Sequence, residues 1–495
     1  MSGSGASRSV APVAIEARGW GWRHAGRRDW ALRGLDLRIE AGERVLLVGP
    51  SGAGKSTMLN AVAGLLDPHA GHAEGRLTVD GRDPRDARDT SGLVFQDPES
   101  QLVMARAGDD VAFGLENRCL PRDAIWPRVE AALSAVGFAY GPDHPTDALS
   151  GGEQQRLAIA GVVALRPGLL LLDEPTANLD PEGAALVRGV VASVVEQLGM
   201  TLLMVEHRVA DAIELVDRVI AVEAGGGIVA DGPPDYVFMR HGDALADAGV
   251  WVPDRRLPAP PVRARPAAET LLMADQAEFR YPGSVLPALP RTDLQVKSAE
   301  ALAVVGPNGS GKSTLAFLLA GLLRPTGGSV VAGESLAPGR GHEPIAAWPA
   351  GELAGRIGTV FQDPEHQFLT SRVRDELTVG PRAAGLDHSA AVKRAEELLA
   401  RLHLERLADA NPFTLSGGEK RRLSVATALA AAPAVLILDE PTFGQDRRTA
   451  IELLRLLAAL RDEGRAVLFV THDREFATAL ADRTLRLAAR GSVPA

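Results

Sequence analysis

One stretch of nine residues occurs twice in the chain, and it constrains the fold more than any other feature. GPSGAGKST at Gly49–Thr57 returns as GPNGSGKST at Gly306–Thr314, and both copies match the pattern G-x-x-x-x-G-K-[ST]. Each copy follows a short apolar run and precedes a segment with helical character. Glycines in such a loop let backbone N–H groups close around phosphate oxygens, and the following helix presents its positive end to them. A Gly-rich turn without function is the alternative, and two matches in this context count against it.

Three further motifs repeat in the same order. The loop lysines are 257 residues apart (312 − 55), whereas each later pair is 266 apart (362 − 96, 416 − 150, 440 − 174). A constant offset predicts two homologous domains, and the difference of nine (266 − 257) places an insertion within Gly333–Gly355 of the second copy. The repeated motifs are FQDPESQ and FQDPEHQ (Phe95–Gln101, Phe361–Gln367), LSGGEQQRL and LSGGEKRRL (Leu149–Leu157, Leu415–Leu423), and LLLDEPT and LILDEPT (Leu170–Thr176, Leu436–Thr442).

Composition narrows the class of protein. The 495 residues are 46% hydrophobic, which is enough to bury the cores of several domains. The formal net charge of −10 offers no overall basic field for nucleic acid. A single cysteine, Cys119, cannot form an internal disulfide, and its isolation argues against a zinc site. No run approaches the roughly 18–20 apolar residues of a membrane span, and the N-terminal segment lacks the apolar region of a secretory signal. We therefore expect a soluble, cytoplasmic protein, which would need partners for any work at a membrane.

The domain boundaries follow from the repeat and from a proline-rich stretch between its copies. We predict a disordered tail at 1–11, a first domain at 12–245, a linker at 246–268 and a second domain at 269–495. Five prolines within Trp251–Ala268 favour an extended linker. An ordered segment packed on one domain is the alternative for Val250–Val252.

Short continuous apolar runs precede the polar motifs in both halves. Such runs are typical of parallel strands buried on both faces, with functional loops at their carboxyl ends. The predicted fold class is α/β. The runs are Val45–Val48, Leu169–Leu172, Leu202–Val205, Ala303–Val305, Val435–Leu438 and Val467–Val470.

Two of these runs end in an Asp-Glu pair, Asp173-Glu174 and Asp439-Glu440. The first carboxylate of each pair would hold Mg²⁺, and the second would polarise the attacking water as general base. A solvated acidic turn is the alternative, and a phosphate loop upstream disfavours it.

The phosphate loops supply the remaining local contacts to nucleotide. Lys55 and Lys312 would reach the β- and γ-phosphates, and Ser56 and Ser313 would bind Mg²⁺. The candidate ATP-binding residues of the loops are Gly49, Pro50, Ser51, Gly52, Ala53, Gly54, Lys55, Ser56, Thr57, Gly306, Pro307, Asn308, Gly309, Ser310, Gly311, Lys312, Ser313 and Thr314.

The LSGGE motifs contain capping boxes, Ser150-x-x-Glu153 and Ser416-x-x-Glu419, which predict the start of a helix. The two glycines of each motif allow close approach of the backbone to a ligand. A helix N-terminus with a free hydroxyl and bare glycine amides can bind an anion. The candidate residues are Ser150, Gly151, Gly152, Ser416, Gly417 and Gly418.

In this order and combination, the motifs resemble those of the ATP-binding cassette (ABC) ATPases, and the resemblance covers nearly the whole chain outside the tail and linker. It implies two P-loop NTPase domains in tandem, each with a mostly parallel core sheet, an antiparallel β subdomain and a helical subdomain. In that family two domains hold two nucleotides head to tail. By resemblance Lys55 shares an ATP with Ser416, and Lys312 shares one with Ser150, so ATP and Mg²⁺ are the implied cofactors.

The resemblance also assigns residues outside the loops. Gln96 and Gln362 match the glutamine that touches Mg²⁺ and the attacking water and senses the membrane partner. His207 and His472 match the switch histidine that contacts the γ-phosphate, where a core histidine is the default alternative.

Asp180 and Asp446 match the aspartate that crosses the dimer interface, and the second copy departs from the pattern with Gln445 in place of leucine. Trp22 and Tyr281 lie 33 (55 − 22) and 31 (312 − 281) residues before the loop lysines. They are candidate adenine-stacking aromatics, and a core role for Trp22 stays open.

Finer details resemble the ATPases of energy-coupling factor (ECF) vitamin and metal transporters, in the fused form. They are DDVAFG (Asp109–Gly114), RDELTVGP (Arg374–Pro381), EPTFGQD (Glu440–Asp446) and the tetrapeptide VEHR. By resemblance the protein is peripheral at the cytoplasmic face of the cell membrane, with a transmembrane coupling protein and a membrane substrate-binding protein as partners. Docking grooves would be lined by Phe95, Leu102, Phe361 and Phe368, although core roles for Phe95 and Phe361 stay open.

Other classes of protein with two ATP-binding cassettes remain as alternatives. Sugar importers with two cassettes on one chain commonly have a degraded site, whereas both copies here keep every motif. A ribosome-acting tandem ATPase typically has a long charged helical arm, and a DNA-repair cassette has heptad coiled coils. The transported substrate stays open among vitamins and metal ions, with EPTFGQD and VEHR pointing to the thiamine-precursor branch.

Overall fold

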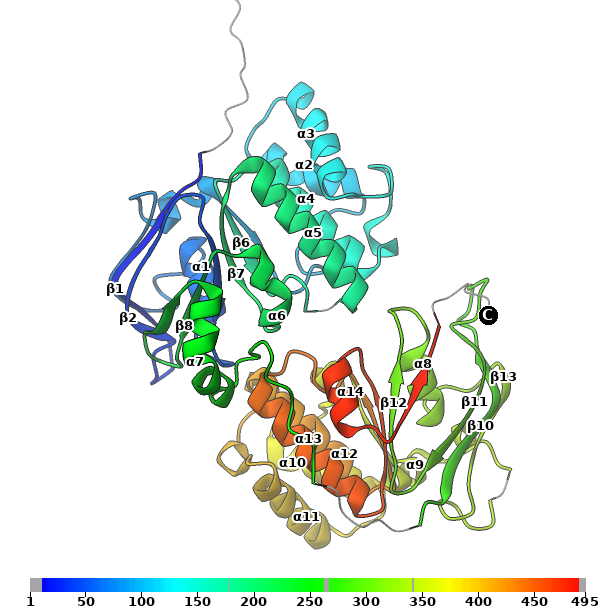
Figure 1. The fold of residues 1–495 in the computed structure, drawn as a ribbon. Coiled ribbons are helices and arrows are strands. Elements are labelled where there is room, and N and C mark those ends of the chain that lie inside the picture. Colours follow the sequence, from blue (N-terminus) through cyan, green and yellow to red (C-terminus); the bar gives the residue numbers. More distant parts are fainter. Residues whose placement is uncertain (1–10, 178, 262–266, 341, 489–495) are drawn as a thin grey trace, which may run out of the picture. The chain divides into compact units, whose positions relative to one another are not determined.

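The computed structural model describes residues 11–177, 179–261, 267–340 and 342–488. The chain divides into two compact units, one of residues up to Arg255 together with Asp446–Arg448, and one of Arg256–Gln445 together with the residues from Thr449 on (Figure 1). The predicted tail, apart from Ala11, and residues 262–266 of the predicted linker lie outside the described part. Val250 and Val252 are buried in the core of the first unit. Packing of the first unit therefore continues into the stretch read as linker, while the predicted boundaries themselves stay predictions.

The main sheet of the first unit has the strand order β5-β6-β7-β3-β8-β9, parallel throughout except for the β8–β9 pair. Residues 169–172, at the centre of β6, are fully buried, as expected for a strand covered on both faces. The strands are β3 (Arg44–Val48), β5 (Ser91–Val94), β6 (Leu169–Asp173), β7 (Thr201–Val205), β8 (Arg218–Val222) and β9 (Ile228–Gly232).

A second sheet of the first unit is antiparallel, with the order β2-β1-β4. Helices α2, α3 and α4 pack on one another and form a helical subdomain beside the main sheet. These strands are β1 (Ile15–His24), β2 (Leu32–Ile39) and β4 (Gly71–Val79); the helices are α1 (Lys55–Val62), α2 (Ala107–Asn117), α3 (Arg122–Ala135), α4 (Gly151–Ala164), α5 (Pro181–Leu198), α6 (Val209–Ala212) and α7 (Pro234–Ala248).

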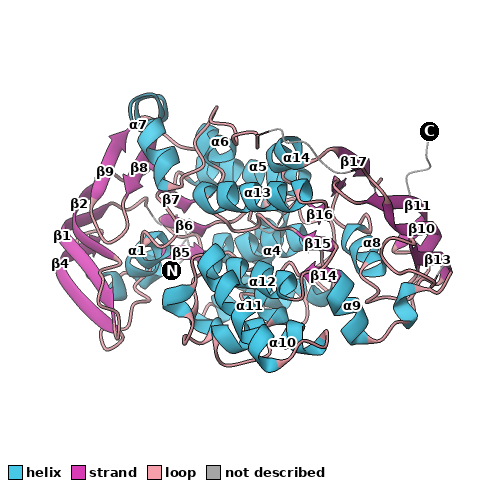
Figure 2. Cartoon of the chain, turned by 90° about the horizontal axis from the view of Figure 1, so that it is seen from below, coloured by secondary structure: helices cyan, strands magenta, loops and turns pink. Residues whose placement is uncertain are grey.

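The second unit repeats this plan (Figure 2). Its main sheet is wholly parallel with the order β14-β15-β16-β12-β17, and its antiparallel sheet has the order β11-β10-β13. The strands are β10 (Thr270–Phe279), β11 (Leu289–Lys297), β12 (Ala301–Val305), β13 (Gly327–Ala332), β14 (Ile357–Val360), β15 (Val435–Asp439), β16 (Ala466–Val470) and β17 (Arg483–Arg486). The helices are α8 (Lys312–Leu319), α9 (Ala350–Arg356), α10 (Val373–Ala383), α11 (His388–Arg401), α12 (Gly417–Ala430), α13 (Arg447–Asp462) and α14 (Arg474–Leu480).

The stretch of the predicted insertion is a longer connection in the second unit, residues 333–356 between β13 and β14 against 80–90 between β4 and β5, and it includes helix α9. The first unit has only two single-turn 3₁₀ helices at this place, Pro84–Asp86 and Arg88–Thr90. The extra residues of the second unit bury Trp348, whose ring lies under the guanidinium groups of Arg340 and Arg356 at 5.3 and 5.4 Å. The longer connection thus brings an aromatic anchor of its own.

The predicted fold class is confirmed in each unit: an α/β domain with a mostly parallel core sheet, an antiparallel β subdomain and a helical subdomain. All six apolar runs named from the sequence are parallel strands. Within the described residues, every helix is too short or too polar to cross a lipid bilayer.

Candidate functional site

Each phosphate loop joins a buried parallel strand to the helix that follows it. In the first unit Gly54 adopts the left-handed conformation at φ 85°, and a Cβ there would meet the carbonyl oxygen of Ala31 at 2.5 Å. Only glycine satisfies both demands. Gly311 repeats them in the second unit, with φ 92° and the carbonyl of Ala288 2.3 Å from a built Cβ. The sequence pattern therefore encodes a compact loop that no other residue could close.

The loop lysines fold back over their own loops. Lys55 Nζ donates to the carbonyl oxygens of Gly49 and Pro50 at 2.9 and 3.0 Å. Lys312 Nζ does the same to Gly306 and Pro307 at 3.0 and 2.9 Å. Burial lowers the pKa of Lys55, opposed by the nearby acids Glu174 and Asp173. These ammonium groups stand over the concave side of loops whose amides can receive phosphate.

The first carboxylate of each Asp-Glu pair fits a magnesium ion. The Oδ1 atoms of Asp173 and Asp439 are buried without a hydrogen-bond partner. A hydrogen bond from the neighbouring loop serine, Ser56 or Ser313, reaches each aspartate. Burial raises the pKa of both, that of Asp439 to about 6. A carboxylate and a hydroxyl beside a phosphate loop form the sparse oxygen set that Mg²⁺ takes together with substrate phosphates.

The second carboxylate of the first unit makes two polar contacts. Glu174 is buried, its φ is 48°, and its Oε1 lies 2.8 Å from His207 Nε2. Gln96 Nε2 donates to Glu174 Oε2 at 2.9 Å. Burial raises the pKa of Glu174, but His207 and Lys55 outweigh burial and hold this pKa below its usual value. Three residues assigned from separate motifs thus meet at one carboxylate, because β5, β6 and β7 end side by side.

The second unit repeats the histidine contact and changes the glutamine. His472 Nδ1 lies 3.0 Å from Glu440 Oε1, and the backbone N–H of His472 donates to Glu440 Oε2 at 3.3 Å. Gln362 is held through its backbone, since its carbonyl accepts a hydrogen bond from Arg421 Nη2 at 2.6 Å. The two sites are therefore complete in residue type and different in their contacts.

Ser150 and Ser416 of the two LSGGE motifs are the N-cap residues of helices α4 and α12, as the capping boxes predict. The backbone N–H groups of Ser150 and Ser416 each donate to the glutamate three residues on at 2.8 Å. Gly417 has open space where a side chain would stand, and the nearest atom to a Cβ on Gly151 is 3.8 Å away. Packing within a unit does not require glycine at either position. The start of each helix is therefore open to close approach from outside its own unit's packing.

The structure separates the two candidate adenine-stacking aromatics. Trp22 is buried in the core and pairs with Leu32 across β1 and β2, which is the core alternative. Tyr281 is 42% exposed and follows the strand β10. The residue that corresponds to Tyr281 is His24 (281 − 257), whose Nε2 lies 3.2 Å from Thr57 Oγ1 of the phosphate loop.

Trp22 thus takes the core role that the sequence left open, and His24 is the exposed ring at the position of Tyr281. The offset of 257 residues between the loop lysines was the signal that could have found it. The same offset pairs Trp22 with the buried Phe279. Each unit therefore has a buried aromatic residue near the end of its strand, β1 or β10, and an exposed ring two residues later, His24 or Tyr281.

A buried acid adjoins the first site and was not singled out from the sequence. Glu206, the acid of VEHR, is buried and accepts a hydrogen bond from Thr176 Oγ1 at 2.7 Å. Burial raises its pKa to about 7, against the opposing hydrogen bond from Thr176. The second unit has Thr471 there, whose hydroxyl accepts from the N–H of Asp473 at 3.0 Å. The signal available in the sequence was an acidic residue directly after the apolar strand β7.

The residues assigned to docking grooves differ in exposure. Phe95 is exposed, Leu102 packs partly against the core, and Phe368 is buried against Phe413. Phe361 is half-buried beside Phe317. The structure instead exposes Val103 next to Leu102 and Leu369 next to Phe368, at 63% and 75%.

Asp180, which the resemblance assigns to the dimer interface, is the N-cap of α5 and accepts a hydrogen bond from the N–H of Gly183 at 2.7 Å.

Comparison with known proteins agrees with this geometry. The model of the family described as "ABC transporter" matches residues 32–177 and 289–443. A protein of Bacillus subtilis (strain 168), named "Putative HMP/thiamine import ATP-binding protein YkoD", is 34% identical over 92% of this chain and 86% of its own length. A "Putative ABC transporter ATP-binding protein" of Streptomyces avermitilis is 36% identical over 94% and 90%.

Among solved structures, the archaeal ribosome recycling factor aABCE1, in complex with the ribosomal stalk protein aP1, aligns with a TM-score of 0.61. The alignment covers 94% of this chain and 87% of that one at 21% identity, so the likeness concerns the fold alone. Family match, relatives and the duplicated site lead to one conclusion: this chain belongs to the ABC transporter family and is an ATP-binding, ATP-hydrolysing protein with two cassettes in tandem.

Proposed function

We propose that this protein is the ATPase subunit of an energy-coupling factor importer for a small nutrient, a vitamin or a metal ion. The observation that carries the proposal is the duplication of an intact site, with Glu174 against His207 in one unit and Glu440 against His472 in the other. Two complete sites suit a transporter in which both cassettes hydrolyse ATP. The import named for the relative of Bacillus subtilis supports the direction of transport.

In each proposed site, residues of this chain position the attacking water and the γ-phosphate. Glu174 and Glu440 accept a proton from the attacking water and orient it toward the γ-phosphate. His207 and His472 leave the carboxylate and contact the γ-phosphate when nucleotide is present. Mg²⁺, held by Asp173 with Ser56 and by Asp439 with Ser313, would neutralise charge on the β- and γ-phosphates.

We further propose that the two cassettes pair head to tail around two ATP molecules. Open space at Gly417 and the exposed start of helix α12 support this, since a helix N-terminus with bare glycine amides can receive the phosphate held by the other cassette. Binding of each γ-phosphate by both halves favours the closed state, and hydrolysis removes that bridging charge. The domain limits 12–245 and 269–495, joined by 246–268, are part of this proposal.

The proposed partners are a transmembrane coupling protein and a membrane substrate-binding protein, with this chain peripheral at the cytoplasmic face. Exposed Phe95 and Val103 beside Gln96, and exposed Leu369 after Gln362, support docking of apolar helices near each glutamine loop. Single exposed apolar residues are common on monomers, so the support for docking comes from their position in the segments that contain Gln96 and Gln362. The thiamine-precursor branch is the substrate that the relative's name favours.

Affinity purification of the tagged chain from detergent-solubilised membranes tests this proposal. We expect two hydrophobic subunits to be recovered in stoichiometric amounts, and their loss when Phe95 and Leu369 are both changed to Asp. Permease domains accompanied by an extracellular binding protein would favour another type of ABC importer. Recovery of ribosomal subunits instead would favour a translation factor and overturn the assignment to membrane transport.

A further inference from the structure

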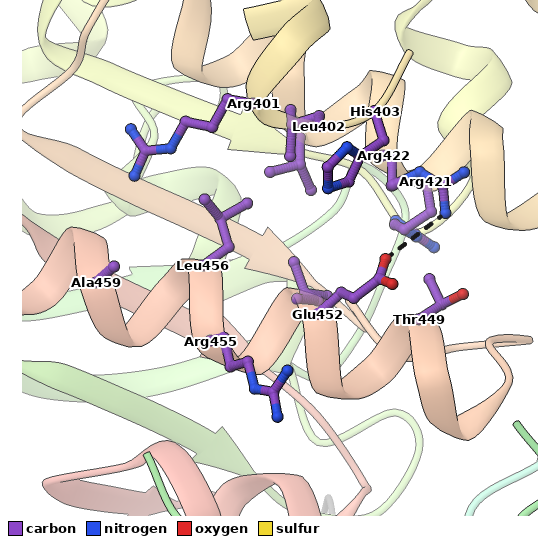
Figure 3. Close-up of a pocket in the computed structure, with 12 residues that line it drawn as sticks. Arg401, Leu402, His403, Arg421, Arg422, Thr449, Glu452, Arg455, Leu456 and Ala459 are labelled. Atoms are coloured by element: carbon purple, nitrogen blue, oxygen red, sulfur yellow. Dashed lines mark ion pairs between the residues drawn. The ribbon is translucent and has the colours of Figure 1, made fainter. Parts of the chain in front are cut away.

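A cavity of about 310 Å³ lies within the second unit, between the end of α11 and the helices α12 and α13 (Figure 3). Its volume is at the lower end of the range for small-molecule sites. Figure 3 shows Leu402 and His403 on one side of the space, and Glu452 and Leu456 of α13 on the other. The apolar part of the lining is made by Leu402, Val425, Leu453, Leu456 and Ala459.

The charged part of the lining is strongly cationic. It contains four arginines and one acid, Glu452, which lies 4.0 Å from Arg422 Nη1. Arg401 also pairs with Glu463 outside the lining, at 3.4 Å. Positive charge facing an apolar wall is complementary to a ligand with an apolar body and one anionic group. The four arginines are Arg401, Arg421, Arg422 and Arg455.

Two of these guanidinium groups carry buried donors with no partner. The Nε atoms of Arg421 and Arg422 are buried and unbonded. Arg421 is 2% exposed, and its two other nitrogens donate to the carbonyls of Phe361 and Gln362 at 2.7 and 2.6 Å. Burial lowers the pKa of Arg421 to about 10, so the group keeps its charge at neutral pH. The acids Asp363, Asp439 and Glu440 act on the charge of Arg421, so the unused donors, and not an unbalanced charge, are what point to an anion here.

At the corresponding positions, 266 residues earlier, the first unit keeps one of the four arginines, Arg156 in place of Arg422 (422 − 156), and differs at the other three. Gly137 stands where the second unit has His403 (403 − 137), and Gln155 stands where it has Arg421 (421 − 155). Both Gly137 and His403 adopt the left-handed conformation, at φ 62° and 55°, which glycine adopts without strain. The second unit therefore accepts a strained backbone to place an imidazole at the cavity. Ala135 and Gly189 likewise replace Arg401 and Arg455.

We propose that this cavity of the second cassette is a binding site for a small anion with an apolar body, either a carboxylate or a phosphate monoester. The anionic group lies against the arginines, and the apolar body lies against Leu402, Leu453 and Leu456. Arg421 connects the cavity to the segment that contains Gln362. Its side chain lines the cavity and also donates hydrogen bonds to the backbone carbonyls of Phe361 and Gln362. Occupancy of the cavity thus bears on Gln362 without any contact to nucleotide.

Calorimetric titration of the full chain with 1-naphthoate and 1-naphthyl phosphate tests this inference, with the neutral 1-naphthamide as control. We expect saturable binding of at least one of the two anions at one molecule per chain, and affinity at least tenfold weaker for the amide. Binding should persist with saturating MgATP, because the cavity is separate from both phosphate loops. Absence of saturable binding, equal affinity for the amide, or displacement by MgATP overturns the proposal.

Variants at exposed positions place the bound probe. His403→Gly gives the second unit the residue of the first at a backbone position that suits glycine, and Arg455→Gln removes a charge from the exposed face of α13. Each should weaken binding at least fivefold, with thermal unfolding unchanged. Lys393→Gln is the matched control, since it removes an exposed charge from α11 outside the lining. Unchanged affinity in both cavity variants, or equal weakening in the control, overturns the assignment.

Discussion

His207 Nε2 lies 2.8 Å from Glu174 Oε1, so the proposed switch histidine and the proposed general base of the first cassette are in direct contact. A γ-phosphate would compete with the carboxylate for the same imidazole. We therefore propose that the contact is a resting arrangement in which His207 holds Glu174, and that phosphate binding frees the carboxylate. His472 and Glu440 repeat the contact at 3.0 Å, so we expect both sites to follow the same sequence of events.

The double variant Glu174→Gln/Glu440→Gln tests the general-base assignment. Glutamine keeps the size of the side chain and loses its basicity, so hydrolysis should fall by at least about 100-fold, the usual contribution of a general base. ATP binding should survive, because the phosphate loops are untouched. Phosphate release and retention of radiolabelled ATP measure the two effects. Turnover near the wild-type rate would show that neither carboxylate is the base.

Tyr281→Ala should weaken nucleotide binding, whereas Trp22→Ala should lower the stability of the fold. Loss of an exposed stacking ring should weaken ATP binding to the second cassette by about 1–3 kcal/mol, the typical value of base–aromatic stacking. Loss of the buried Trp22 should lower the free energy of unfolding by about 3–5 kcal/mol through the cavity it leaves. Fluorescent-nucleotide titration and urea unfolding separate them. Stable protein with weakened nucleotide binding in the Trp22 variant would restore the original assignment.

Glu206→Gln should change the pH dependence of stability. The folded-state pKa of Glu206 is raised to about 7 from 4.5, so its contribution is fully present below about pH 4.5 and is lost as pH rises through 7. The free energy of unfolding should fall by about 3 kcal/mol over that range in the parent, after other groups are subtracted. The glutamine variant should lack this component. Urea unfolding at pH 5 and pH 8 measures it.

Glu196→Gln serves as the control for that experiment, since Glu196 is an exposed carboxyl on helix α5. Its pH dependence should match the parent. A Glu206→Gln variant that also matches the parent would mean that Glu206 is ionised at little cost in the folded protein.

Gly417→Ala tests the head-to-tail pairing. A Cβ at Gly417 meets open space within its own unit, and alanine in place of glycine generally stabilises a helix by about 0.4–1 kcal/mol where the backbone permits it. Thermal stability should therefore be kept or raised. Hydrolysis should fall by at least tenfold, because the added methyl group obstructs the phosphate brought by the other cassette. Full activity in this variant would count against close approach at the signature helix.

The sequence by itself determined the two-domain α/β fold, the parallel strands and the identity of the residues at the strand ends. Such prediction succeeds because phosphate binding and water activation demand particular residue types at fixed places, such as Lys55 after a glycine loop and Glu174 after a buried strand. The duplication then checks each assignment against its copy. The predicted insertion was located by the same comparison, although its helix and its anchor Trp348 were not foreseen.

Tertiary structure alone decided which aromatic is buried, which acid is shielded and which side chains line a cavity. Trp22 and His24 are two residues apart on one strand and so share a face, and only the packed structure shows that the core covers Trp22 while His24, the last residue of β1, lies beside Thr57. Glu206 has a raised pKa because of what surrounds it, which no spacing reveals. The cationic cavity near Arg421 gathers residues from three helices. Burial and long-range proximity are properties of the packed chain, whereas local motifs record only what one segment must contribute.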